Sequence, residues 1–167
     1  MYFWNTKKLV EDFKNDDVSQ KEAMKYLIAI SLFMVLGTFL SELFPSDELS
    51  DKESMYLYIE YLLITLITII GVYLCYEKNE KVDSKNFIER FVCFALPIGI
   101  KSFLLILTIF IGMAIIHGNI KSGGFEAYMA DPFNEIKYSI FYELFFYQGV
   151  YRAIGKLKQQ EETPQLA

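Results

Sequence analysis

The chain has 167 residues, of which 53% are hydrophobic and 17% aromatic, and its mean hydropathy is +0.25. This composition is too apolar for an ordinary water-soluble domain and excludes intrinsic disorder, while the net charge of -5 and the two cysteines exclude a basic nucleic-acid-binding protein and a disulfide scaffold. Because the charged residues fall in short blocks between long apolar runs, the sequence predicts a polytopic membrane protein.

Residues 1–18 are predicted to form an amphipathic cytoplasmic or interfacial helix. Leu9, Val10 and Phe13 share one helical face between lysines and acids. Two placements fit this pattern. The helix lies at the headgroup level with Phe3, Trp4 and Phe13 as membrane-interface anchors, or it packs against the other helices on the cytoplasmic side.

A four-helix transmembrane bundle is predicted for residues 19–157. The sequence Ser19-Gln20-Lys21-Glu22 fits a capping box, so the chain is expected to turn near Asp16 and Asp17 before the first span. A hydrocarbon core of about 30 Å takes roughly 20 helical residues, and an unpaired backbone group inside it is costly. The prediction is therefore an all-α fold with spans at about 26–44, 55–76, 91–117 and 136–154, followed by a polar tail at 158–167.

The third span allows two arrangements because it is longer than one crossing needs and contains Pro97 near its start. In the first, one long tilted helix bends at Pro97. In the second, residues 84–96 lie along the cytoplasmic interface and the crossing begins near Ile98. The second arrangement places Lys101 at the inner boundary of the membrane.

The distribution of Lys and Arg predicts the orientation, since positively charged loops stay in the cytoplasm. Twelve of the 16 cations fall on the side that holds both ends of the chain, and two fall in the other connections, at Lys52 and Lys121. The twelve are Lys7, Lys8, Lys14, Lys21, Lys25, Lys78, Lys81, Lys85, Arg90, Arg152, Lys156 and Lys158. The sequence thus predicts a multi-pass protein of a plasma membrane or a bacterial inner membrane, with cytoplasmic termini.

Four polar residues of the spans are the candidate functional residues: Glu143, Lys101, Gln148 and Glu60. An ionisable group inside a span costs about 2.5–3.5 kcal/mol at the helix centre, so it needs a partner or a path to water. Glu60 lies near tyrosines at the start of its span and is expected to reach headgroup water. His117 lies at the end of the third span and is expected to act as a polar cap of that helix.

Glu143 is the sharpest of these candidates because it lies near the middle of the fourth span. A buried ion pair with Lys101 is one hypothesis, and it requires the long-helix arrangement of the third span. The alternative is a neutral Glu143 that is hydrogen-bonded to Gln148, to a hydroxyl group or to another subunit.

The connections and the small residues of the spans give further predictions. The acidic connection at 46–53 is expected to be a solvated surface, and 118–134 contains turn signals with Asp131 as a helix cap. Small residues four apart, such as Gly149 and Ala153, would let helices approach closely.

The sequence lacks the residues from which enzymes usually build a site. It has one histidine, no aspartate within a span and no glycine-rich phosphate loop, so no enzyme, cofactor or metal is predicted. The segment from Tyr142 to Gly149 resembles the Glu-Glu-x-x-x-Arg motif of the membrane-embedded prenyl-protein protease family. Tyr142 and Tyr147 replace the first Glu and the Arg, so no family is assigned.

The sequence therefore predicts a non-enzymatic integral membrane protein that acts as an interacting or regulatory membrane subunit. The expected partners are the lipid bilayer and either further copies of the chain or a membrane or cytoplasmic protein, and nucleic acid is not expected. The alternative is a homo-oligomeric channel or a proton-coupled small-solute transporter that uses the embedded carboxylate.

Overall fold

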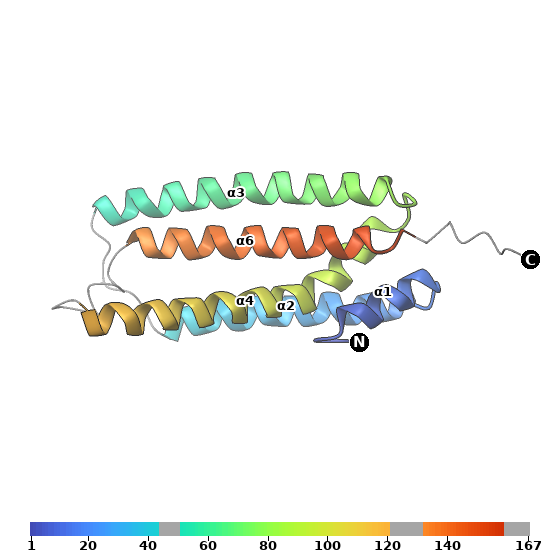
Figure 1. Cartoon of the computed structure of the whole chain (residues 1–167), viewed down its shortest axis with the longest axis horizontal. Coiled ribbons are helices and arrows are strands. Elements are labelled where there is room, and N and C mark those ends of the chain that lie inside the picture. The colour runs from blue at the N-terminus through green and yellow to red at the C-terminus, as the bar shows by residue number, and fades with distance from the viewer. Residues whose placement is uncertain (44–50, 121–131, 159–167) are drawn as a thin grey trace, which may run out of the picture.

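The computed structural model describes residues 1–43, 51–120 and 132–158, without the side chains of 37–43, 51–53, 117–120, 132 and 135. These ranges contain five helices and no strand, which confirms the all-α prediction. The helices are α1 (Thr6–Lys14), α2 (Gln20–Leu43), α3 (Asp51–Glu80), α4 (Phe87–Ile120) and α6 (Pro132–Gly155). The four long helices follow the long axis of the molecule, and α1 lies at one end of it (Figure 1).

The four predicted spans fall within the four long helices, except that Phe44 lies outside the described residues. Two segments, Ser54–Glu80 in α3 and Phe87–Ile116 in α4, are long and apolar enough to cross a membrane. The connections at 44–50 and 121–131, Asp131 included, and the tail from residue 159 also lie outside the described residues.

Side-chain caps define where α1 and α2 begin. The side chain of Asn5 accepts a hydrogen bond from the backbone N–H of Lys8 at 3.1 Å, and Ser19 Oγ accepts one from the N–H of Glu22 at 3.3 Å. Only this half of the predicted capping box forms, since the Glu22 carboxylate accepts from Lys25 Nζ at 2.7 Å. Asp16, with φ of 55°, lies in the turn between α1 and α2, as predicted.

The long helices form a row and not a closed four-helix bundle. Helix α3 packs on α6, α6 packs on α4, and α4 packs on α2, whereas the described parts of α2 make no contact with α3 or α6. The four-helix bundle expected from the sequence is thus not confirmed. Helix α2 buries Ala23 and Tyr26 near its start, whereas all six side chains of 31–36 are exposed, so this middle part of the helix has no buried face.

Helix α4 runs without interruption through Pro97 and bends in its first third, the part that contains this proline (Figure 1). The helix is thus continuous and bent, as the first arrangement of the third span predicts, and the point where a crossing begins stays a prediction. The bend brings the start of α4 toward the end of α3, and Pro97 itself is fully buried.

Two glycines permit close packing between helices, one between α3 and α6 and the other between α6 and α4. A Cβ on Gly71 of α3 would overlap the ring of Tyr147, and a Cβ on Gly149 would stand 2.6 Å from Ile98 Cγ2 of α4. The predicted close approach at Gly149 is confirmed, and Gly71 adds a second one between α3 and α6.

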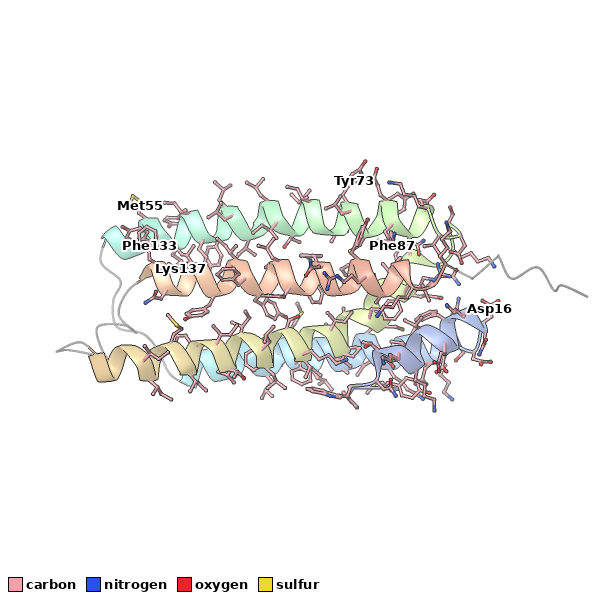
Figure 2. The ribbon with its side chains drawn as sticks, in the orientation of Figure 1. Asp16, Met55, Tyr73, Phe87, Phe133 and Lys137 are labelled. Atoms are coloured by element: carbon pink, nitrogen blue, oxygen red, sulfur yellow. The ribbon has the colours of Figure 1, made fainter. Side chains whose placement is uncertain are left out.

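The buried core gathers at the end of the molecule where α1 lies, which we call the α1 end. Buried side chains there come from α1, the start of α2, the end of α3, the bent part of α4 and the end of α6. Farther along the long helices, most apolar side chains are exposed. Figure 2 shows nitrogen and oxygen atoms gathered near Asp16, at the α1 end, and mostly carbon along the middle of α3.

Candidate functional site

Helix α1 packs against the long helices through its apolar face. Leu9, Val10 and Phe13 are buried, and the ring centroid of Phe13 lies 5.5 Å from that of Phe94 on α4. The structure thus shows the packed placement of α1. Of the three predicted membrane anchors, Phe13 belongs to the protein core, because its ring faces α4, whereas Phe3 and Trp4 are exposed.

A hollow of about 340 Å³ lies between the first turns of α1, the middle of α4, and the second half of α6 with Lys156 directly after it. Its polar lining consists of four cations and three uncharged groups, and its apolar lining comes from all three helices. The lining residues are Thr6, Lys7, Val10, Ile98, Lys101, Ser102, Leu105, Phe145, Gln148, Gly149, Arg152, Ala153 and Lys156. We call this space the α1–α4–α6 hollow.

The charge in the hollow has one sign. Lys7, Lys101, Arg152 and Lys156 line it, and no carboxylate does. Within the described part of the chain, none of these four cations forms an ion pair. Four uncompensated positive charges around one space repel each other, so an anion bound there would be stabilised by all of them.

Lys101 points toward α1. Its Nζ donates a hydrogen bond to Thr6 Oγ1 at 3.1 Å and lies 5.8 Å from the centroid of the Trp4 ring. This cation therefore lies beside the start of α1.

Lys101 and Glu143 are not brought together, so the hypothesis of a buried ion pair is not supported by the structure. Arg152, which lines the hollow with Lys101, follows Glu143 by nine residues, or about 180° around an ideal helix. Glu143 is half-buried on the other side of α6, and its carboxylate makes no hydrogen bond or ion pair with any described residue. Gln148, the proposed alternative partner, is exposed and lines the hollow.

Glu60 is buried, with 7% of its surface exposed, and so differs from the carboxylate open to water that the sequence predicted. Tyr56 lies one helical turn earlier on the same face and contacts Phe133 of α6, with ring centroids 5.4 Å apart. Glu60 thus lies on the face of α3 that packs against α6. The side chain of His117 is outside the described residues.

A polar cluster at the turn between α3 and α4 has no counterpart among the sequence predictions. Arg90, only 4% exposed, donates from Nη2 to Asp83 Oδ2 at 2.7 Å and from Nη1 to Asn79 Oδ1 at 2.9 Å. The buried Asn79 donates in turn to the carbonyl of Lys85 at 3.1 Å. The hydrogen bonds from Arg90 hold the pKa of the Asp83 carboxyl below its ordinary value.

This cluster fixes the turn and neutralises Arg90, which is one of the twelve cations counted for orientation. The one sequence signal for this cluster is the spacing of its members, which is i, i+4 and i+11 for Asn79, Asp83 and Arg90. Among the described residues, no group of three His, Cys, Asp or Glu side chains is placed to hold a metal ion, and the two cysteines are free and buried.

Comparison with known proteins gives no relative: no protein-family model, no curated protein and no solved structure matches this chain.

Proposed function

We propose that this chain is an integral membrane protein that acts as a non-enzymatic interacting or regulatory subunit. In this proposal α2, α3, α4 and α6 all cross the bilayer, and the α1 end faces the cytoplasm. The observation that carries it is the contrast between a packed α1 end, which holds most of the charged residues, and long helices that expose apolar side chains along most of their length.

The exposed apolar surface supports membrane embedding. Leu32, Met34 and Val35 of α2 are more than 60% exposed, and α3 and α4 expose apolar side chains of similar size over several turns. Monomeric soluble proteins rarely expose contiguous apolar patches larger than a few hundred Å². A lipid environment removes this cost for all four helices at once.

The positions of the Lys and Arg residues support the cytoplasmic orientation of the α1 end. Helix α1, the start of α2, the turn from α3 to α4 and the end of α6 all lie there, and they carry the twelve cations of one side. Exposed cations at this level are suited to contacts with anionic lipid or with an acidic protein surface.

Chemical cross-linking in native membranes tests the role as a subunit. The full chain carries a photoreactive residue at exposed Lys14 or Lys21, and the matched control carries it at exposed Tyr58 in the apolar stretch of α3. We expect the two basic positions, but not Tyr58, to capture one protein in a constant ratio, identified by mass spectrometry. Capture of lipid alone from every position would contradict the proposal.

The alternative function, a homo-oligomeric channel or proton-coupled transporter, is favoured by one observation. Glu143 is half-buried in the middle of α6 and has no hydrogen-bond or ion-pair partner among the described residues, and an unpaired carboxylate inside a span is costly. The row of helices leaves α2 and α3 at its edges, where further copies could pack.

The oligomeric state in nanodiscs, measured by native mass spectrometry, separates the two functions. A monomer would contradict the channel, because four helices alone pack without a lumen. For a defined oligomer, the channel predicts that Glu143→Gln abolishes proton-dependent flux in vesicles, while Glu89→Gln, at the α1 end of α4, leaves it intact. Full flux in Glu143→Gln would exclude this use of the carboxylate.

A further inference from the structure

The α1–α4–α6 hollow changes from basic to apolar along the long axis of the molecule. Arg152 and Lys156 lie near the α1 end of the molecule. Phe145 precedes Arg152 by seven residues and so lies about 10 Å farther from that end along the helix. Helix α4 runs in the opposite direction, so Leu105 lies one turn beyond Lys101 on the same side as Phe145. One end of the hollow is therefore cationic and the other is apolar.

The basic end has the donors that a phosphate group requires. Besides the four cations, the hydroxyls of Thr6 and Ser102 and the amide of Gln148 line it, and Ser102 is more than nine-tenths buried. Helix α1 begins here and has no acidic residue in its first turn, so its N-terminal dipole adds to the positive potential. An anion with several acceptor oxygens would be bound by charge-assisted hydrogen bonds.

The apolar end distinguishes a lipid from a soluble anion. Leu105 and Phe145 are 44% and 40% exposed, so the hollow opens sideways between α4 and α6. A soluble anion would use only the basic end, whereas a lipid acyl chain would cover these two side chains. Trp4, beside Lys101, is 57% exposed, and exposed tryptophans favour the headgroup level of a membrane.

We propose that the α1–α4–α6 hollow binds one anionic phospholipid of the cytoplasmic leaflet, with its phosphate among Lys101, Arg152 and Lys156 and an acyl chain against Leu105 and Phe145. This inference rests on the proposed membrane embedding and goes beyond it by naming a ligand class and its residues. Bound lipid would neutralise the mutual repulsion of the cations and join α1 to α4 and α6.

Trp4 makes the test direct, because it is the one tryptophan of the chain and lies next to the site. The full chain is reconstituted in phosphatidylcholine vesicles that contain increasing fractions of phosphatidylglycerol brominated on the acyl carbons nearest the glycerol, where a bromine of a lipid bound at Lys101 lies close enough to quench Trp4 fluorescence. Brominated phosphatidylcholine at the same fractions is the headgroup control. We expect the anionic lipid to quench Trp4 at a much lower fraction than the zwitterionic lipid does.

The variant Arg152→Gln/Lys156→Gln removes two charges of the hollow without touching Trp4. Since hydrogen bonds to charged groups contribute more than neutral ones, the loss should weaken the selective quenching by about tenfold or more. The control Lys14→Gln/Lys158→Gln removes the same charge from exposed positions that do not line the hollow, and it should behave like the unmodified chain.

Each remaining outcome overturns a defined part of the proposal. Equal quenching by the two headgroups, or an undiminished effect in Arg152→Gln/Lys156→Gln, would show that the hollow is not the lipid site. Relief of quenching by inorganic phosphate would assign the site to a soluble anion. Flotation of the vesicles keeps the two proposals apart: a chain that does not float contradicts membrane embedding, whereas a floating chain without lipid selectivity overturns the lipid site alone.

Discussion

Replacing Gly71 by alanine tests the close packing of α3 against α6. An added Cβ would stand 2.5 and 2.6 Å from Cδ2 and Cδ1 of Tyr147 and closer still to Cγ. Ordinary carbon contacts are about 3.5–4.0 Å, so the two helices must separate by about 1 Å to accept the methyl group. The ring atoms nearest the backbone cannot rotate away, so the displacement falls on α6 itself.

The expected cost follows from two opposing effects. Overpacking of a well-packed site costs about 1–3 kcal/mol, and alanine is favoured over glycine in a helix by up to about 1 kcal/mol. We therefore expect Gly71→Ala to weaken the α3–α6 contact by about 1–2 kcal/mol. Gly112→Ala on α4 is the matched control, because a Cβ there meets no atom within 4 Å.

The labelling rate of Cys75 by a small thiol reagent in detergent micelles measures this contact. Cys75 lies one turn after Gly71, is fully buried, and has its Sγ 3.8 Å from the carbonyl oxygen of Tyr147. A loss of 1–2 kcal/mol corresponds to labelling faster by a factor of about 5–30. Equal rates in Gly71→Ala and Gly112→Ala would refute the close packing of the two helices.

Three further predictions concern the α1 end. Phe13→Ala should cost about 3–5 kcal/mol of packing between α1 and α4 and speed tryptic cleavage after Lys14, and an unchanged cleavage rate would contradict this packing. Because Arg90 lowers the pKa of Asp83, the ion pair stabilises the fold above pH about 4 and is lost as the pH falls through the lower folded pKa. Melting temperatures between about pH 3 and pH 7 should thus fall more steeply for the unmodified chain than for Asp83→Asn, and parallel curves would exclude this contribution. Gly155→Ala should change stability little, since its Cβ would meet Cε at the flexible end of Lys78, and a loss like that of Gly71→Ala would show that Lys78 is held rigidly.

The local features of the fold were predictable from the sequence. Long apolar runs specify the four long helices. The cap at Ser19 and the turn at Asp16 each depend on a few adjacent residues, so they too were predictable. Pro97 correctly indicated a bend, because the effect of proline on a helix is local.

The order of the helices and the composition of the site were not predictable in the same way. The long helices are apolar on most sides, so their sequences do not show which faces meet, and the row of α2, α4, α6 and α3 follows only from the structure. Lys101 meets Thr6 across 95 residues of sequence. Such a contact is determined by packing between distant segments, as is the grouping of Lys101 with Arg152 and Lys156.

The most direct test of the membrane topology is cysteine labelling in intact cells with a reagent that does not cross membranes. Ser46→Cys, Ser84→Cys and Ser122→Cys are introduced one at a time into a chain whose Cys75 and Cys93 are replaced by alanine. Four crossings with a cytoplasmic α1 end predict that Ser46→Cys and Ser122→Cys are labelled from outside, and that Ser84→Cys is labelled only after the membrane is permeabilised. Labelling of Ser84→Cys in intact cells, or equal protection of all three positions, would contradict this topology.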